Sequence, residues 1–249
     1  MDVVAARLAS TEPRPAYLLG WDIDKGNGRA VISAGNPDTA DNVATYVPGT
    51  TSNLRDPDHL ISRMDTMAND ATVADPAHTT ASILWLGYDA PQLLDVDATS
   101  GSYADAVRDS GDLRTFQEGL RATHEGGPSH NTLLGHSYGT TVIGYTAREP
   151  QGINADEVVL IASPGVGVDH ASDLHGVPAG HVWATTSAFD VIRIVPDERY
   201  GANPVDGSFG ARQFGVDWNP LHGHTNYWDG NYADNPVRRE LADIITGTG

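Results

Sequence analysis

The stretch that most constrains the fold is Asn131–Thr141, with the sequence NTLLGHSYGTT. Thr132–Leu134 has the apolar character of the end of a buried strand, and Thr140–Arg148, which is followed by Pro150, has the pattern of a helix. The glycine-x-serine-x-glycine between them is typical of a sharp strand-to-helix turn. Both glycines are needed because such a turn leaves no room for side chains two residues to either side of Ser137.

This turn lifts the Ser137 hydroxyl above the sheet and points the first amides of the next helix at the same space. The sequence therefore predicts Ser137 as a nucleophile and the N–H of Tyr138 as one donor of an oxyanion hole. The second donor is expected after the third strand, in Pro48-Gly49-Thr50. There Gly49 permits close approach of the backbone and Thr50 supplies its N–H. The alternative is a plain Pro-Gly turn.

The rest of the chain alternates between strand and helix patterns. Strands are expected at residues 17–23, 29–33, 42–47, 83–86, 132–134, 158–162, 181–186 and 211–216, and helices at 53–75, 113–124, 140–148 and 237–245. The turn DKGNG makes the first two strands an antiparallel hairpin. This order predicts an α/β fold with a mostly parallel, eight-stranded sheet covered by helices on both faces. The irregular stretches 88–112, 166–180 and 191–210 are expected to line the site entrance.

Composition excludes several classes of partner and chemistry. With 33 acidic and 15 basic residues, a formal net charge of −18 disfavours binding to nucleic acid and to anionic membranes. The absence of cysteine excludes disulfides, thiolate metal ligands and a cysteine nucleophile. No apolar run is long enough to span a membrane, and the first residues lack a signal-peptide pattern. We expect one domain over residues 1–249, with 1–15 as an N-terminal extension, cytoplasmic as given or secreted if an upstream segment was removed.

A serine nucleophile needs a base within reach, and the base needs a carboxylate that orients it. After a turn of this kind, the order along the chain is serine, acid, histidine. Asp190 closes the strand predicted to begin at residue 181, and it is therefore the predicted acid. Its rivals are Asp169, Asp197 and Asp217; the first two lie off any strand end, and the third precedes the histidine too closely.

Two of the ten histidines lie where the base belongs, between the last strand and the last helix. These are His222 and His224, in PLHGHTNYWD, and the spacing leaves both open. His136, at the variable position of the serine turn, is interpreted as structural because its side chain should point away from the nucleophile. Asp95 and Asp97 lie in DVDATSG, which fails the EF-hand pattern and is interpreted as a solvated loop.

Six segments match one known superfamily in order: YLLGWD, GRAVISAGNPDTADNV, VPGTTS, WLGYDAP, LLGHSYGTT and GHTNYWD. With them, the chain resembles the α/β-hydrolase superfamily of serine hydrolases, and is most similar to a bacterial domain-of-unknown-function branch with a GHSYG nucleophile elbow. The resemblance implies the α/β-hydrolase fold, with Ser137 as nucleophile, Asp190 as acid and His224, rather than His222, as base. Members of that branch often carry a helical region ahead of the hydrolase domain.

The expected activity is hydrolysis of carboxylic esters through an acyl-enzyme, with a small-molecule ester or acyl substrate and no cofactor or metal. An acyltransferase, thioesterase or cyclase would use the same triad with another acceptor. A binding domain that keeps the fold without the chemistry is the third alternative. The segment between Ser163 and His181 is too short for a large helical lid, so we expect little or no lid and no interfacial activation. The sequence does not predict the oligomeric state.

Overall fold

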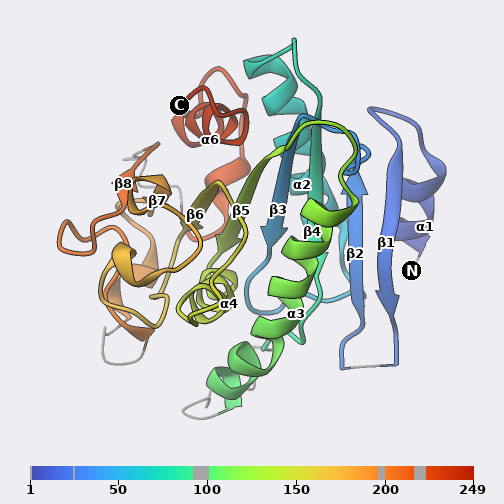
Figure 1. Ribbon diagram of the computed structural model, residues 1–249. Coiled ribbons are helices and arrows are strands. Elements are labelled where there is room, and N and C mark those ends of the chain that lie inside the picture. The colour runs from blue at the N-terminus through green and yellow to red at the C-terminus, as the bar shows by residue number, and fades with distance from the viewer. Residues whose placement is uncertain (1, 25, 92–100, 196–199, 216–222) are drawn as a thin grey trace.

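The computed structural model describes residues 2–24, 26–91, 101–195, 200–215 and 223–249, with the backbone alone for 101–109 and 179 (Figure 1). Its strands are β1 (Ala16–Asp22), β2 (Arg29–Ala34), β3 (Asn42–Val47), β4 (Thr80–Leu86), β5 (His130–His136), β6 (Glu157–Ile161), β7 (Val182–Thr185) and β8 (Arg212–Gln213). Its α-helices are α1 (Asp2–Ala9), α2 (Asp58–Ala74), α3 (Gly101–Thr123), α4 (Tyr138–Ala147) and α6 (Pro236–Ile245). Short 3₁₀ helices are η2 (Ala171–Asp173), η3 (Ala179–His181), η4 (Val191–Ile194) and η5 (Asn226–Trp228).

The strands form one eight-stranded sheet in the order β1-β2-β4-β3-β5-β6-β7-β8. Strand β2 pairs antiparallel with both β1 and β4, and every other pairing is parallel. The predicted eight-stranded, mostly parallel sheet is therefore confirmed. Because β3, β5, β6 and β7 run parallel, their carboxyl ends meet at one edge, where chemistry is expected in such sheets.

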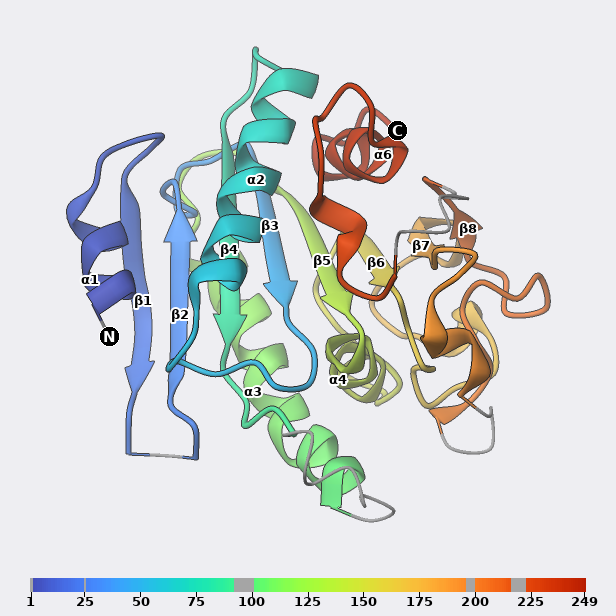
Figure 2. The same ribbon diagram turned by 180° about the vertical axis from the view of Figure 1, so that it is seen from behind.

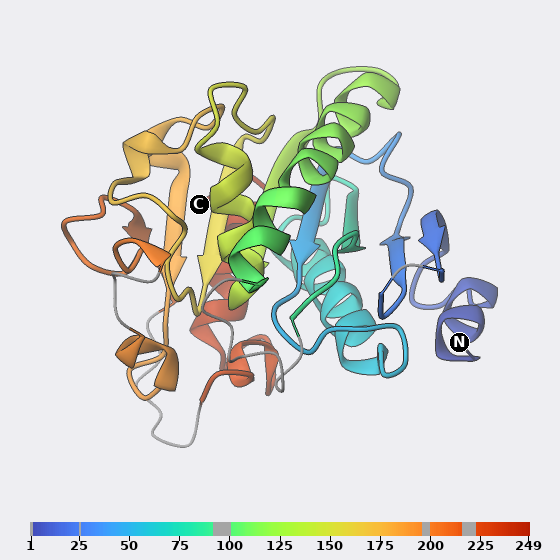
Figure 3. The same ribbon diagram turned by 90° about the horizontal axis from the view of Figure 1, so that it is seen from below.

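Helices cover both faces of the sheet. Helices α3 and α4 lie on one face and α2 and α6 on the other, as the front and back views show (Figures 1 and 2). Seen from below, the chain forms three layers with the sheet in the middle (Figure 3). Alternate residues of the central strands enter the two cores: Leu133 packs with residues of α3 and α4, and Leu134 with residues of α2 and α6.

The structure extends two predicted elements toward their N-termini. Helix α3 begins at Gly101, whereas the prediction placed residues 88–112 among the irregular stretches, because 101–112 has few apolar residues at helical spacing. Strand β4 begins at Thr80 rather than residue 83, because Thr80 and Ser82 are polar although they are buried. Between Ser163 and His181 the helices are the short η2 and η3, in agreement with the prediction of little or no lid.

No helix within the described ranges combines the length and apolar character needed to cross a membrane.

Candidate active site

Ser137 lies in a strained turn between β5 and α4. Its backbone has φ 55° and ψ −130°, a conformation that residues with a side chain rarely adopt. Such a conformation costs on the order of 1–3 kcal/mol and persists only where the surroundings hold it. The Ser137 N–H donates to the carbonyl of Ile161 at the end of β6, and the Ser137 carbonyl accepts from Thr140 Oγ1. The turn is therefore fixed by strand β6 on one side and by helix α4 on the other.

Three glycines make this turn possible, because each lies against backbone or against Ser137. A Cβ at Gly135 would lie 2.7 Å from the Thr140 nitrogen, and a Cβ at Gly139 would lie 2.1 Å from the Val47 carbonyl oxygen. A Cβ at Gly49 would lie 2.7 Å from the Ser137 Cβ. The close packing predicted at both glycines of the motif is confirmed, and the loop after β3 lies directly beside the serine.

His224 connects Ser137 to Asp190. Its Nε2 lies 2.7 Å from Ser137 Oγ, and its Nδ1 lies 2.9 Å and 3.0 Å from the two carboxylate oxygens of Asp190. An ionised carboxylate only accepts hydrogen bonds, so Nδ1 carries a proton and Nε2 of the neutral ring is free to accept the proton of the serine hydroxyl. The structure thus brings together the three residues predicted as nucleophile, acid and base.

The Asp190 carboxylate is buried and fully hydrogen-bonded. Its side chain is 0% exposed, and it accepts from the Ile192 N–H and the Tyr227 hydroxyl as well as from His224. Burial alone would raise the pKa of Asp190, but the bonds from His224, Tyr227 and Ile192 outweigh it and hold this pKa below its usual value. Asp190 therefore stays ionised where it faces His224.

Tyr227 is a site residue that the sequence analysis did not assign. Its hydroxyl lies 2.6 Å from Asp190 Oδ2 and accepts a hydrogen bond from the Ser187 N–H. Since the N–H of Ser187 occupies the acceptor side, the hydroxyl proton points to Asp190. Burial and the neighbouring Asp190 raise the pKa of Tyr227, which keeps it a donor. Its position three residues after His224, in GHTNYWD, is the only signal in the sequence.

His136 and Arg63 hold the main chain at His224. His136 is buried and its Nε2–H donates to the His224 carbonyl at 2.7 Å, while Arg63 donates to the Thr225 carbonyl at 3.1 Å. Burial, and then the nearby Arg63 and His224, lower the pKa of His136 well below its usual value, so the ring is neutral. The prediction of a structural His136 agrees with these contacts. Its ring also packs against that of His224, with 5.0 Å between the two ring centroids.

The predicted oxyanion donors lie on the two segments that border Ser137. Tyr138 is the first residue of α4, and Thr50 follows Gly49 in the loop after β3. Tyr88 donates from its hydroxyl to the Pro48 carbonyl and so ties this loop to the end of β4. This arrangement is compatible with the predicted roles of the Tyr138 and Thr50 N–H groups, which stay predictions.

The remaining candidates lie elsewhere or outside the described residues. Asp169 accepts a long hydrogen bond from the Ala202 N–H and belongs to an exposed loop. The predictions for Asp95, Asp97, Asp197, Asp217 and His222 concern residues outside those that the structure describes.

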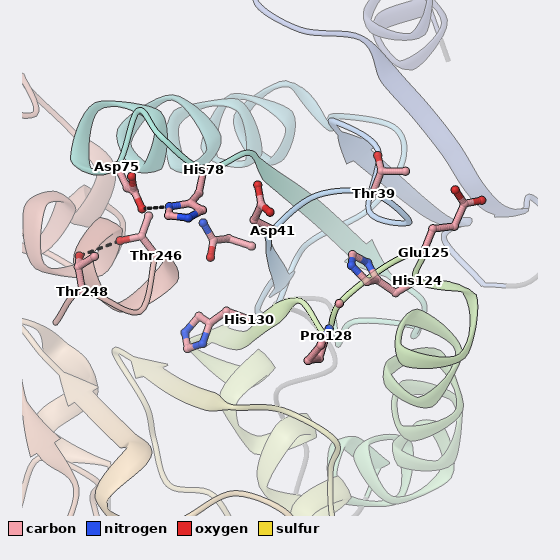
Figure 4. A pocket seen from close by; sticks show the side chains of 12 residues that line it. Thr39, Asp41, Asp75, His78, His124, Glu125, Pro128, His130, Thr246 and Thr248 are labelled. Carbon is pink, nitrogen blue, oxygen red and sulfur yellow. Dashed lines mark hydrogen bonds and ion pairs between the residues drawn. The ribbon is translucent and has the colours of Figure 1, made fainter.

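A polar cleft of about 430 Å³ opens at the amino ends of β3 and β5, on the side of the sheet away from Ser137. Its wall includes Asp75 and His78 from the loop before β4, Asp41 from the loop before β3, and His124 and His130 from the end of α3 and the start of β5 (Figure 4). His78 is paired with Asp75, and across the described part of the chain no three such side chains are placed to hold a metal ion. The cleft therefore has no part in the arrangement around Ser137.

Replacing Tyr227 with phenylalanine should destabilise the protein by about 1–3 kcal/mol at pH 7, because it leaves a buried carboxylate oxygen and the Ser187 N–H without this partner. The bonds to Asp190 lower its folded pKa, so their stabilisation is present above the unfolded value of about 3.9 and is lost as the pH falls through the folded pKa. The difference between variant and wild type should therefore shrink at about pH 3.5. Urea unfolding at both pH values measures this difference in the free energy of unfolding.

Tyr145→Phe is the matched control, since Tyr145 is equally buried but lies in helix α4 and contacts no acid of the site. Its effect should be the same at both pH values. An equal loss at both pH values for Tyr227→Phe would show that the hydroxyl does not act through the charge of Asp190.

The sheet order and the strained serine turn after β5 define the α/β-hydrolase class of folds. The comparison with protein families agrees: residues 24–199 match the family described as alpha/beta hydrolase, and the chain belongs to that family. An uncharacterized protein of Mycobacterium tuberculosis is 32% identical over 279 aligned positions, which cover 98% of this chain and 41% of that protein. A second one is 40% identical over 128 positions, or 51% of this chain and 46% of the relative. The chain thus spans less than half the length of these relatives.

Solved structures of similar fold include esterases. A fungal esterase from Rhizomucor miehei superposes with a TM-score of 0.59 at 11% identity, over 94% of this chain and 85% of that one. Esterase PE8 superposes with a TM-score of 0.54 at 17% identity, over 85% of this chain and 95% of that one. At sequence identities this low, the similarity to these two structures shows the fold alone.

Proposed function

We propose that this protein is a serine hydrolase that cleaves carboxylic esters through an acyl-enzyme, with Ser137 as nucleophile, His224 as base and Asp190 as orienting acid. The observation that carries the proposal is the continuous hydrogen-bonded series from Ser137 Oγ through His224 to Asp190. Membership of the alpha/beta hydrolase family supports it. Folding does not require a hydroxyl, an imidazole and a buried carboxylate in this order, but acyl transfer does.

In the first half of the proposed reaction, Ser137 Oγ forms a bond to the ester carbonyl carbon while His224 Nε2 takes the hydroxyl proton. The resulting oxyanion is stabilised by the N–H groups of Tyr138 and Thr50. His224 then gives its proton to the alcohol oxygen, the bond between carbonyl carbon and alcohol oxygen breaks, and the alcohol leaves an acyl group on Ser137. Asp190 stabilises the imidazolium that exists between the two proton transfers.

In the second half, a water molecule attacks the acyl carbon and gives a proton to His224. The carbon–Oγ bond breaks, Ser137 recovers its proton from His224, and the carboxylic acid is released. The same residues would pass the acyl group to another alcohol or to an amine if one replaced water.

Stopped-flow kinetics with p-nitrophenyl esters, followed by mass mapping of the quenched protein, tests the proposal. A burst of p-nitrophenol equal to the enzyme concentration and an acyl group on Ser137 are the expected results. Repeating the reaction with added alcohols and amines shows whether water is the main acceptor. Hydrolysis without an acyl group on Ser137 would contradict the mechanism.

A further inference from the structure

We propose that three exposed apolar side chains beside Asp190, those of Phe189, Val191 and Ile194, form a rim that binds a long apolar chain of the ester. We call these three residues the apolar rim. The inference rests on the proposed function and gives it a substrate class: esters whose acyl or alcohol part is a long uncharged hydrocarbon chain.

The apolar rim stands out because large hydrophobic side chains are seldom exposed together. Phe189 is 54% exposed, Val191 68% and Ile194 83%. Among the described residues, the other group of exposed large hydrophobics lies on and just after β1, at the opposite end of the sheet from β7, and Val73 on α2 is exposed by itself. Within the described ranges, the apolar rim is therefore the exposed apolar group that lies next to Asp190 in the chain.

The local backbone explains why these side chains face outward together. The Asp190 side chain points inward to His224, and its two neighbours in sequence, Phe189 and Val191, are exposed. Val191 and Ile194 lie three residues apart in the 3₁₀ helix η4, where residues at this spacing share a face. Ile192, on another side of the helix, packs against the core beneath α2 and α6. The segment that positions the acid therefore also presents an apolar ridge to solvent.

Both charged side chains of residues 189–194 are engaged in hydrogen bonds, although the protein as a whole is strongly acidic. The only cation of the segment, Arg193, directs its guanidinium to the carbonyls of Thr186 and Ser187, and the only anion, Asp190, has a side chain that is 0% exposed. The exposed side chains of the apolar rim are themselves hydrocarbon, and within residues 189–194 the two charged groups already have hydrogen-bond partners. Such side chains favour an uncharged apolar chain over a charged group.

The distance to the serine suits a long chain. The two hydrogen bonds from Ser137 through His224 to Asp190 measure 2.7 and 2.9 Å. Phe189 and Val191 are one residue from Asp190, with Cα atoms about 3.8 Å from its Cα. Summed, these links place the nearest Cα atoms of the apolar rim at most about 15 Å from Ser137 Oγ. An acetyl group bound at Ser137 does not reach it, whereas a chain of about ten carbons does.

The test compares esters of graded length with the wild type and a Phe189→Ser, Ile194→Ser double variant. The substrates are p-nitrophenyl acetate to dodecanoate, and dodecyl acetate for a long alcohol. We expect kcat/KM for p-nitrophenyl dodecanoate or for dodecyl acetate to fall about tenfold in the variant, because two apolar contacts are lost. The value for p-nitrophenyl acetate should stay within about twofold. Val73→Ser removes an exposed apolar residue on α2 and should leave kcat/KM unchanged for both the long and the short esters.

A parallel change for all substrates would overturn the proposal, and so would kcat/KM values for both p-nitrophenyl dodecanoate and dodecyl acetate that stay unchanged relative to p-nitrophenyl acetate. A second measurement needs no turnover: calorimetric binding of N-dodecylacetamide should weaken about tenfold in the double variant. If the protein bound this amide through the apolar rim but hydrolysed none of the esters, the proposed function would be wrong and the apolar rim would be supported. Equal binding by wild type and variant would show that the apolar rim does not bind the hydrocarbon chain.

Discussion

Ser137→Ala should abolish labelling by a fluorophosphonate probe and lower kcat for ester hydrolysis by about 10⁴–10⁶. The reason is that every covalent step of the proposed reaction passes through Ser137 Oγ, the atom 2.7 Å from His224 Nε2. Alanine removes this atom but fits the space that serine occupied, so the fold should be retained. Gel fluorescence after labelling and steady-state kinetics measure the two losses.

Ser82→Ala is the matched control for this variant. Ser82 is also fully buried and lies on β4, and its hydroxyl has no hydrogen-bond partner in the described structure. Its removal should leave both labelling and turnover near the wild-type values. If folded Ser137→Ala were still labelled, or kept more than a few per cent of the activity, another residue would be the nucleophile.

Asp190→Asn should lower kcat by about 10⁴, although the side chain keeps its size. Asparagine presents one acceptor oxygen where Asp190 presents two. If the NH₂ group takes the Oδ1 position, it faces another donor, the Ile192 N–H. If it takes the Oδ2 position, it faces the donating hydroxyl of Tyr227. In either orientation an NH₂ group also faces His224 and favours the ring tautomer with its proton on Nε2, which cannot take the proton of Ser137.

A control variant and circular dichroism distinguish this effect from a loss of fold. Asp169→Asn changes a rival acid in an exposed loop and should keep wild-type kinetics. Circular dichroism of Asp190→Asn should remain native, because the backbone around η4 is fixed by other bonds as well. Activity within tenfold of wild type in folded Asp190→Asn would remove Asp190 from the proposed mechanism.

The serine turn was predictable because its cause is local. Gly135 and Gly139 are dictated by backbone atoms within a few residues or in the adjoining β3 loop, so the spacing of the motif carries the information. The sheet order was predictable for a similar reason, since alternating strands and helices leave few arrangements. Asp190 and His224 followed from their places after strands, and the resemblance to the superfamily was needed to prefer His224 over His222.

Tyr227 and Arg63 could not be predicted, because their roles depend on contacts between distant segments. Tyr227 reaches Asp190 across 37 positions, and Arg63 reaches the Thr225 carbonyl across 162. No local pattern distinguishes such a tyrosine or arginine from one that only packs in a core or on a surface. The apolar rim was missed for a related reason: the sequence placed residues 191–210 in an irregular stretch, but it does not tell which apolar side chains there are exposed.

The separation of Ser137 and His224 by 87 positions has a consequence for synthesis of the protein. Strands β3, β5 and β6, which surround the glycine turn, all precede the segment that carries His224. The histidine is synthesised after all of these elements, and the main chain around it is held by His136 on β5 and Arg63 on α2, which precede it in the chain. If Ser137 is the nucleophile that we propose, a nascent chain carries it without its base, and its reactivity should appear only when the segment with His224 docks.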